Sequence, residues 1–226
     1  MNQKDKLLAI ADVAFNNNLD KKLKVSFNRT IDAQFGIYRW CHALGEGRKS
    51  MDGWLTLSLK PSKGWKDWAI NLAAWADTAG LHKGYHSEWE RYREDFLDCL
   101  ENDWARAAIE KGCIIAGRSK GGAEAVMIAE DIFGMVPGYK ERLLVGAIEA
   151  PHMCDRDWKE ICEIFIPRQN ILVTSYHDDI VPDLVPWLTI PGQRIQLGER
   201  THGKSIKDHT MSTTEEDLLY KEIEKI

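Results

Sequence analysis

The feature that most constrains the fold is a five-residue turn at 117–121, Gly-Arg-Ser-Lys-Gly. It follows the apolar run 113–116 and precedes the helix-like segment 123–133. Glycines two residues before and after Ser119 suit a sharp strand-to-helix turn, because side chains there would collide. Gly122 would then let the helix pack close to the strand. The pattern favours a nucleophile elbow, with the serine exposed above a sheet, over a chance Gly-x-Ser-x-Gly match.

Apolar runs and amphipathic segments alternate along the rest of the chain. Further buried strands are predicted at 142–150, 170–176 and 194–197. Residues 35–44 and 53–60 are predicted to be two strands of a hairpin. Helices are predicted over 4–15 and 87–110, and in a C-terminal segment that Ser212 and Glu215 would open as a capping box. Strands alternating with helices predict an α/β fold, with a mainly parallel central sheet and helices on both faces.

Composition excludes several classes of protein. The 226 residues fit one domain spanning 1–226, and 44% of them are apolar, which is enough for a sizeable core. A net charge of −5 with interspersed signs argues against a nucleic acid partner. No apolar stretch is long enough to span a membrane, and the N-terminus resembles an amphipathic helix more than a signal peptide.

The cysteines and histidines indicate the expected compartment and cofactor requirement. The five cysteines are an odd number without paired spacing, which suggests free thiols in a reducing compartment, and we therefore expect a cytoplasmic protein. No Cys or His cluster has metal-ligand spacing, so we expect no metal and no cofactor.

A nucleophilic serine needs a histidine to accept its proton and an acid to orient that histidine. On an elbow-bearing fold these follow the serine in the order acid, then histidine. Asp178 and Asp179 come directly after the predicted strand 170–176, and His209 lies shortly before the C-terminal helix. Aspartates after strands are also ordinary turn residues, and a loop histidine is often solvated. The rival histidines are His152, His177 and His202.

The segments LKPSKGWKDW at 59–68, HKGY at 82–85 and DIVP at 179–182 match motifs of a known family, and over residues 35–215 the chain resembles that family, the class 3 (fungal-type) lipases. That family has a Phe-Arg-Gly-Ser/Thr segment, with an Asn/Asp-Trp pair five residues after the hydroxyl residue. The sequence LKPSKGWKDW at 59–68 fits this frame, with Ser62 at the hydroxyl position and Asp67-Trp68 at the pair. Leu59-Lys60-Pro61 replaces Phe-Arg-Gly, which is a departure from the family pattern.

Four further motifs carry the resemblance. The family's His-x-Gly-Phe step into a long helix is matched from His82 to Tyr85, and its Gly-x-Pro segment is matched loosely at Pro151. Its Asp-x-Val-Pro motif is matched by DIVP at 179–182, which selects Asp179 over its neighbour as the acid. Asp208-His209 fits the position of the family's histidine.

The resemblance implies an α/β-hydrolase that cleaves carboxylic esters of small or lipid substrates through Ser119, His209 and Asp179. The backbone N–H of Lys120, with the N–H and hydroxyl of Ser62, would bind the oxyanion. The segment 63–81 occupies the family's lid region and is short. Its Trp65 and Trp68 could bind acyl chains or pack in the core.

The basic residues beside Ser119 also depart from the family, which has a histidine before the nucleophile and an apolar residue after it. Arg118 and Lys120 would either favour an anionic substrate or simply point to solvent. Two other functions stay open: a thioesterase or peptidase that uses the same triad, and a hydrolase-like binding protein without catalysis.

Overall fold

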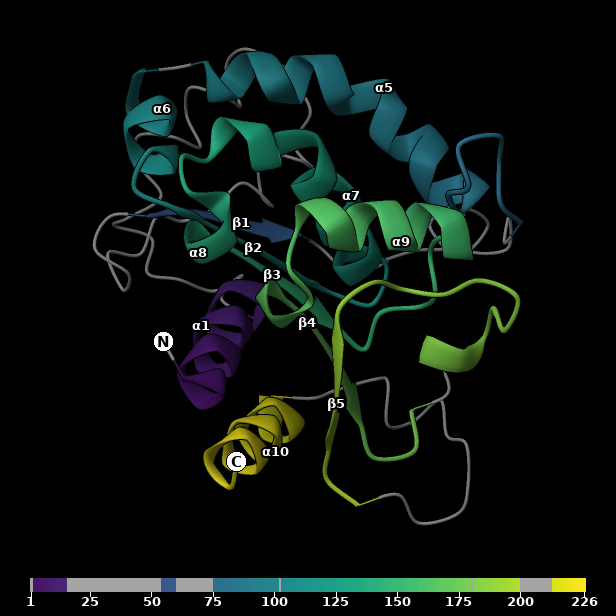
Figure 1. Ribbon diagram of the computed structural model, residues 1–226. Helices are drawn as coiled ribbons and strands as arrows, with labels where there is room; N and C mark the ends of the chain where they lie inside the picture. The colour runs from purple at the N-terminus through teal and green to yellow at the C-terminus, as the bar shows by residue number, and fades with distance from the viewer. Residues whose placement is uncertain (1, 16–53, 60–74, 102, 180, 200–212) are drawn as a thin grey trace.

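A computed structural model of the chain describes residues 2–15, 54–59, 75–101, 103–179, 181–199 and 213–226. Within these ranges lies a five-stranded sheet with every neighbouring pair parallel, in the order β1-β2-β3-β4-β5 (Figure 1). The strands are β1 (Leu55–Leu59), β2 (Cys113–Arg118), β3 (Leu143–Ile148), β4 (Ile171–Tyr176) and β5 (Gln193–Leu197). The strands expected near 53–60, 113–116, 142–150, 170–176 and 194–197 are therefore confirmed.

Helices cover both faces of this sheet, as expected. In Figure 1, α1 and α10 lie on one face, and α5, α7 and α9 lie on the other. The α-helices are α1 (Gln3–Phe15), α5 (Lys83–Leu100), α6 (Asp103–Ile109), α7 (Lys120–Ile132), α8 (Tyr139–Arg142), α9 (Arg156–Phe165) and α10 (Thr213–Glu224). Short 3₁₀ turns are η2 (Phe133–Met135), η3 (Arg168–Asn170) and η4 (Val181–Asp183).

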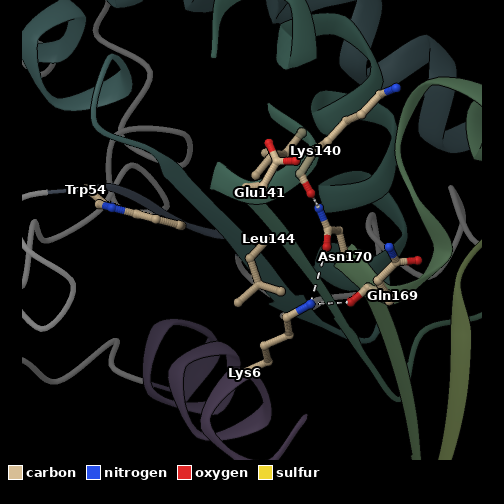
Figure 2. Close-up of a pocket in the computed structure, with 8 residues that line it drawn as sticks. Lys6, Trp54, Lys140, Glu141, Leu144, Gln169 and Asn170 are labelled. Carbon is tan, nitrogen blue, oxygen red and sulfur yellow. Dashed lines mark hydrogen bonds between the residues drawn. The ribbon is translucent and has the colours of Figure 1, made fainter. Parts of the chain in front are cut away.

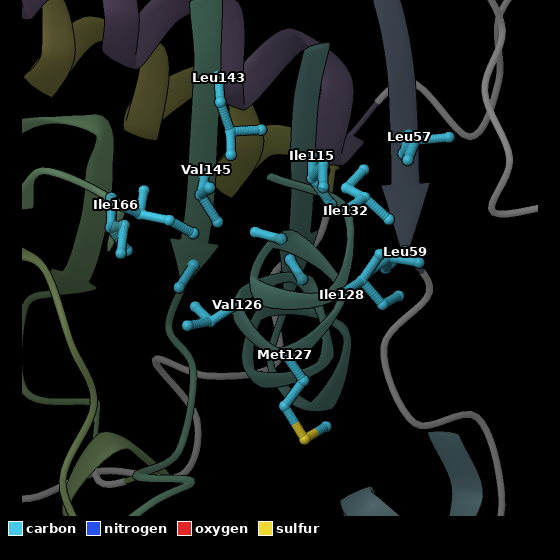
Figure 3. Close-up of a cluster of buried hydrophobic side chains, with 14 of the residues drawn as sticks. Leu57, Leu59, Ile115, Val126, Met127, Ile128, Ile132, Leu143, Val145 and Ile166 are labelled. Carbon is cyan, nitrogen blue, oxygen red and sulfur yellow. The ribbon is translucent and has the colours of Figure 1, made fainter. Parts of the chain in front are cut away.

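The core forms because the central strands are apolar on both faces. β2 and β3 are buried along almost their whole length, as expected for parallel strands covered from two sides. On the α7 side, Val126 and Ile128 of the helix pack with Ile115 of β2 and Val145 of β3 (Figure 3). A second cluster forms between the opposite face and the helices α1 and α10. The first cluster holds α7, and with it the turn before it, against the sheet, and the second closes the opposite face.

One helix prediction needs correction, and one helix was not predicted. The expected helix 87–110 is two helices, α5 and α6, because Glu101, Asn102 and Asp103 form a polar break in the apolar pattern. The helix α9 was not predicted, because charged residues are interspersed with its apolar ones. Its start carries a signal, since the Asp155 side chain accepts a hydrogen bond from the backbone N–H of Trp158 at 2.8 Å.

Parts of two other predictions lie outside the described residues. The first strand of the expected hairpin, 35–44, is among the residues not described, whereas the second strand is β1. The C-terminal helix is present as α10, but Ser212 of the expected capping box precedes the described range.

Candidate active site

Ser119 occupies the sharp turn predicted from the sequence, between the end of β2 and the start of α7. Its backbone has φ 56° and ψ −128°, a conformation that is strained for a residue other than glycine. A Cβ atom at Gly117 would lie 2.4 Å from the backbone of Gly121, so the turn closes too tightly for a side chain at Gly117. The predicted elbow geometry is confirmed.

The turn places Ser119 at the N-terminus of α7. Its side chain makes no capping hydrogen bond to the helix, while its carbonyl accepts from the N–H of Gly122 at 2.9 Å. A Cβ at Gly122 would lie 2.9 Å from the carbonyl oxygen of Gly117 in β2, so the helix packs closely on that strand, as expected. The positive end of the helix dipole therefore lies beside the hydroxyl, where an oxyanion would develop.

The expected oxyanion donors are only partly within the described residues. Lys120 is the first residue of α7, and the first N–H groups of a helix have no partner inside the helix. Its N–H thus occupies a position that suits oxyanion binding, and this role stays a prediction. Ser62 and the expected acyl-binding residues Trp65 and Trp68 lie outside the described residues.

Asp179 lies three residues beyond β4, at the same carboxyl edge of the parallel sheet as Ser119. It is 4% exposed, and its Oδ1 accepts a hydrogen bond from the N–H of Val181 at 2.9 Å. This short-range bond fixes the orientation of the carboxylate. Asp178 beside it is only half-buried. A buried, oriented carboxylate suits the acid of a triad, which supports the choice of Asp179.

The proposed base, His209, lies outside the described residues, as does its rival His202. The two other rivals, His152 and His177, lie within the described residues. His152 is buried, with Nδ1 3.1 Å from the carbonyl of Val185 and Nε2 2.9 Å from the Arg194 guanidinium. Since arginine can only donate, Nε2 of His152 accepts and Nδ1–H donates, so both nitrogens are engaged.

His177, the remaining rival, follows β4 directly. Its Nδ1 lies 3.0 Å from the carbonyl of Glu199. This contact holds the ring against the chain beyond β5. His152 thus has both ring nitrogens bonded elsewhere, and His177 has Nδ1 beside a backbone carbonyl.

Arg118 does not point to solvent, so that expectation is wrong. Its side chain is 13% exposed, and its Nε lies 2.6 Å from Oε2 of Glu149. Glu149 is the first residue after β3 and is fully buried. A role for Arg118 in binding an anionic substrate stays a prediction, but its guanidinium already has a carboxylate partner.

Lys120 is also buried and paired. Its Nζ lies 2.8 Å from Oε2 of Glu88 on α5 and 3.4 Å from Oε1 of Glu124, one turn further along α7. Burial, and then the charges of Glu124 and Glu88, raise the pKa of Tyr85 far above its usual range. The lysine therefore lies in a cluster rich in negative charge, which offsets its own.

The His-x-Gly-Tyr motif lies at the start of α5. His82 is fully buried and stacks on Tyr85 with ring centroids 3.8 Å apart. The N–H of His82 donates to the carbonyl of Met153 at 2.7 Å, in the segment after β3. The motif thus fastens α5 to the carboxyl edge of the sheet, close to the elbow and its paired charges.

Three acidic residues near the elbow were not singled out in the sequence: Glu88, Glu124 and Glu149. Glu149 could have been found, because it is a charged residue near the end of the otherwise apolar predicted strand 142–150. Glu88 carries no such signal, since only the folded chain brings α5 beside α7.

A separate pocket of about 320 Å³ lies at the opposite, amino end of the strands (Figure 2). The Lys6 ammonium donates there to the Gln169 carbonyl at 2.8 Å and to Oδ1 of Asn170 at 3.3 Å. This pocket is therefore remote from the elbow. Within the described ranges, no group of three or more His, Cys, Asp or Glu side chains could hold a metal ion.

A strained serine between a parallel strand and a helix, followed by a buried aspartate after a later strand, defines an α/β-hydrolase fold. Solved lipase structures share this fold, although at low identity. One is lipase II from Rhizopus niveus, with 20% identity, a TM-score of 0.55, and coverage of 70% of this chain and 60% of that chain. Another is a lipase from Rhizopus microsporus var. chinensis, with 17% identity, a TM-score of 0.55, and coverage of 66% and 54% respectively.

A third similar structure is described as a triacylglycerol lipase whose catalytic centre is a serine protease triad. It shares 16% identity, a TM-score of 0.56, and coverage of 64% of this chain and 57% of that chain. The profile of the family Lipase (class 3) matches residues 46–189. The chain therefore belongs to the class 3 lipase family, and the resemblance found in its motifs is confirmed.

The chain is related to these lipases only in part. It spans about 54 to 60% of the length of the three solved lipases. No curated protein sequence matches it. Among the described helices, none is long and apolar enough to cross a membrane.

Proposed function

We propose that this protein is a serine hydrolase that cleaves carboxylic esters through an acyl-enzyme. The observation that carries the proposal is the backbone of Ser119, which is held at φ 56° between β2 and α7. Such strain in a residue other than glycine costs about 1–3 kcal/mol, and it tends to persist where a functional site depends on it. Family membership and a buried Asp179 at the same edge of the sheet support it.

The proposed mechanism assigns one role to each residue of the triad. Ser119 Oγ adds to the ester carbonyl while His209 takes its proton. Asp179 orients His209 and stabilises its charged form. The tetrahedral intermediate collapses, and His209 returns the proton to the leaving alcohol. Water then attacks the acyl-enzyme with His209 again acting as base, which releases the acid and restores the serine.

The oxyanion of each tetrahedral intermediate would be bound at the start of α7. The N–H of Lys120 and the helix dipole would stabilise it, together with the N–H and hydroxyl of Ser62. Removing one such donor typically costs about 10²–10³-fold in kcat.

We propose small or dispersed esters as substrates rather than bulk lipid. The basic residues beside the serine are paired with Glu149, Glu88 and Glu124, so they add little net positive charge at the elbow. An anionic group on the ester is therefore not needed. The segment 63–81 also mixes its tryptophans with lysines and aspartates, which limits the apolar area it could offer to an oil surface.

We also propose that the protein works in a reducing compartment such as the cytoplasm. Cys113, Cys154 and Cys162 are free and buried. Burial raises the pKa of each of these thiols well above its usual value, which keeps them protonated and unreactive. A thiol titration of the protein isolated under non-reducing conditions would test this, and disulfide-bonded cysteines would contradict it.

Ser119→Ala tests the proposed function. Hydrolysis of a short p-nitrophenyl ester should fall by at least about 10³-fold, because the triad loses its nucleophile. The thermal unfolding midpoint of this variant should equal that of the wild type, because alanine removes only the hydroxyl. Ser175→Ala on β4 is a matched control that should keep its activity. If Ser119→Ala retains more than about a tenth of the wild-type rate, the assignment fails, and the binding-protein alternative gains support.

A further inference from the structure

The two strands next to each other at the elbow both end in a strained residue. Ser119 follows β2 with φ 56°, and Glu149 follows β3 with φ 49°. β2 and β3 pair in register up to Arg118 and Ile148. The strained residues are therefore neighbours across the sheet, one residue beyond its last pair.

Backbone hydrogen bonds continue past the strands at these positions. The N–H of Ser119 donates to the carbonyl of Ile148 at 2.8 Å, and the N–H of Glu149 donates to the carbonyl of Thr174 at 2.8 Å. These bonds link the ends of β2, β3 and β4 in a row. They fix the amide nitrogen of Ser119, and its carbonyl accepts from the N–H of Gly122 at 2.9 Å. A side-chain link can hold the turn in addition to these backbone bonds.

Arg118 and Glu149 supply such a side-chain link. The Nε to Oε2 distance is 2.6 Å, and the carboxylate belongs to a fully buried residue. A charge-assisted hydrogen bond of this length is strong, and its low-dielectric surroundings strengthen it further. It joins the residue just before Ser119 to the other strained residue.

We propose that Arg118 and Glu149 form a positioning pair that holds the strained backbone of Ser119 in its nucleophilic geometry. The inference rests on the proposed function. Neither residue needs to touch the substrate; the pair acts through the turn. It therefore competes directly with the prediction that Arg118 binds an anionic substrate.

The chain offers a matched control pair of the same chemistry. Arg93 of α5 and Asp131 of α7 have Nη2 and Oδ1 2.6 Å apart. Asp131 lies eleven residues beyond Lys120 on α7, which is about 16 Å along the helix at 1.5 Å per residue. Breaking that pair removes an arginine–carboxylate contact without touching the elbow.

The experiment measures kcat, KM and the thermal midpoint for the wild type, Arg118→Gln, Arg118→Lys, Glu149→Gln and Arg93→Gln. Substrates are a neutral and a carboxylate-bearing p-nitrophenyl ester. Arg118→Gln and Glu149→Gln should lower kcat by about 10- to 100-fold on both esters, because a misplacement near 1 Å can cost this much. KM should change less than about 2-fold, and Arg118→Lys should recover part of the loss.

Three results would overturn the pair's role. One is that Arg118→Gln and Glu149→Gln lower the thermal midpoint and leave kcat unchanged, which is the behaviour expected of the control Arg93→Gln. Another is a KM increase confined to the carboxylate-bearing ester, which would make Arg118 a substrate contact. The third is an Arg118→Lys enzyme no better than Arg118→Gln. If Arg118→Gln does not fold, Arg118→Lys and Glu149→Gln decide between these results.

Failure of the proposed function is separable from failure of the pair. A wild-type protein that neither hydrolyses an ester nor reacts with a fluorophosphonate at Ser119 would refute the function, and the positioning role with it. A reactive wild type with unaffected Arg118 and Glu149 variants would refute the pair alone.

Discussion

The two ends of the central sheet differ in which residues adopt positive φ. At the carboxyl end, the residues that follow β2, β3 and β4 are Ser119, Glu149 and His177, and all three have positive φ, as does Gly198 after β5. They are the three such residues other than glycine in the described ranges. At the amino end, the positive φ values before β2 and β5 belong to Gly112 and Gly192.

The difference shows which end is adapted for chemistry. Glycine adopts positive φ without the steric cost that a side chain brings. A sheet that needed only tight turns could use it at both ends. At the carboxyl end glycine follows β5, at Gly198, but a serine, a glutamate and a histidine hold strained positions after β2, β3 and β4, which favours a functional use for those side chains. The amino end has a polar pocket whose Lys6 ammonium already has protein partners.

The largest effect after loss of the serine should come from the acid at the carboxyl end. Asp179→Asn should lower kcat by about 10³–10⁴-fold, because the histidine loses the charge that fixes its tautomer. The amide oxygen can still accept from the N–H of Val181, so the local turn is kept. Steady-state kinetics on a neutral ester would measure this.

Asp178→Asn is the matched control for that variant. Its carboxylate is half-buried, and the resemblance to the family does not select it. We expect its kcat to stay within about 3-fold of wild type, as for surface changes away from the chemistry. Equal losses in the two variants would refute the choice of Asp179.

An amino-end variant should change stability and leave catalysis alone. A Cβ at Gly192 would lie 2.4 Å from the carbonyl oxygen of Ile171, and φ is +109°. Gly192→Ala should therefore lower the free energy of unfolding by about 1–3 kcal/mol. Denaturant titration would measure the loss, and kcat should not change.

Gly134→Ala is the control for the amino-end variant. A Cβ there would have no neighbour within 4 Å, and φ is not positive. It should be neutral or stabilising by up to about 1 kcal/mol. If Gly192→Ala lowered kcat as much as carboxyl-end variants do, the division between the two ends would fail.

The smallest expected effect is on the pH dependence of the free energy of unfolding. Burial, and then the Arg194 charge, lower the pKa of His152 below 6.5. Between its folded pKa and 6.5 the unfolded chain binds a proton that the folded chain does not, so stability falls as pH falls through this window. The His152→Gln variant should therefore lose less stability than the wild type between pH 7 and pH 5. Identical pH profiles of unfolding would contradict it.

Much of the fold could be predicted because its signals are local. The strands around Ile115, Val145 and Val173 are short apolar runs. The elbow is a motif of five consecutive residues. The break between α5 and α6 and the start of α9 were missed, although both carry polar residues that end or cap helices. Their signals were weaker than the apolar periodicity around them.

The surroundings of the serine could be predicted less well, because they depend on contacts between distant segments. Arg118 and Lys120 were visible as basic neighbours of Ser119, and Glu124 lies one helical turn from Lys120, but only the fold brings Glu149 and Glu88 to them. Glu149 lies 31 residues beyond Arg118, and Glu88 lies 32 residues before Lys120. No local pattern distinguishes a buried, paired lysine from a solvated one.

The most direct test of the central claim is covalent labelling with a fluorophosphonate, followed by peptide mass spectrometry. We predict a single adduct on Ser119 of the wild-type protein. The labelling rate should fall as pH decreases from about 8 to 5, because a protonated histidine cannot activate the serine. Asp179→Asn should react far more slowly than Asp178→Asn. An unlabelled Ser119, or an adduct on another residue that persists in Ser119→Ala, would contradict the account.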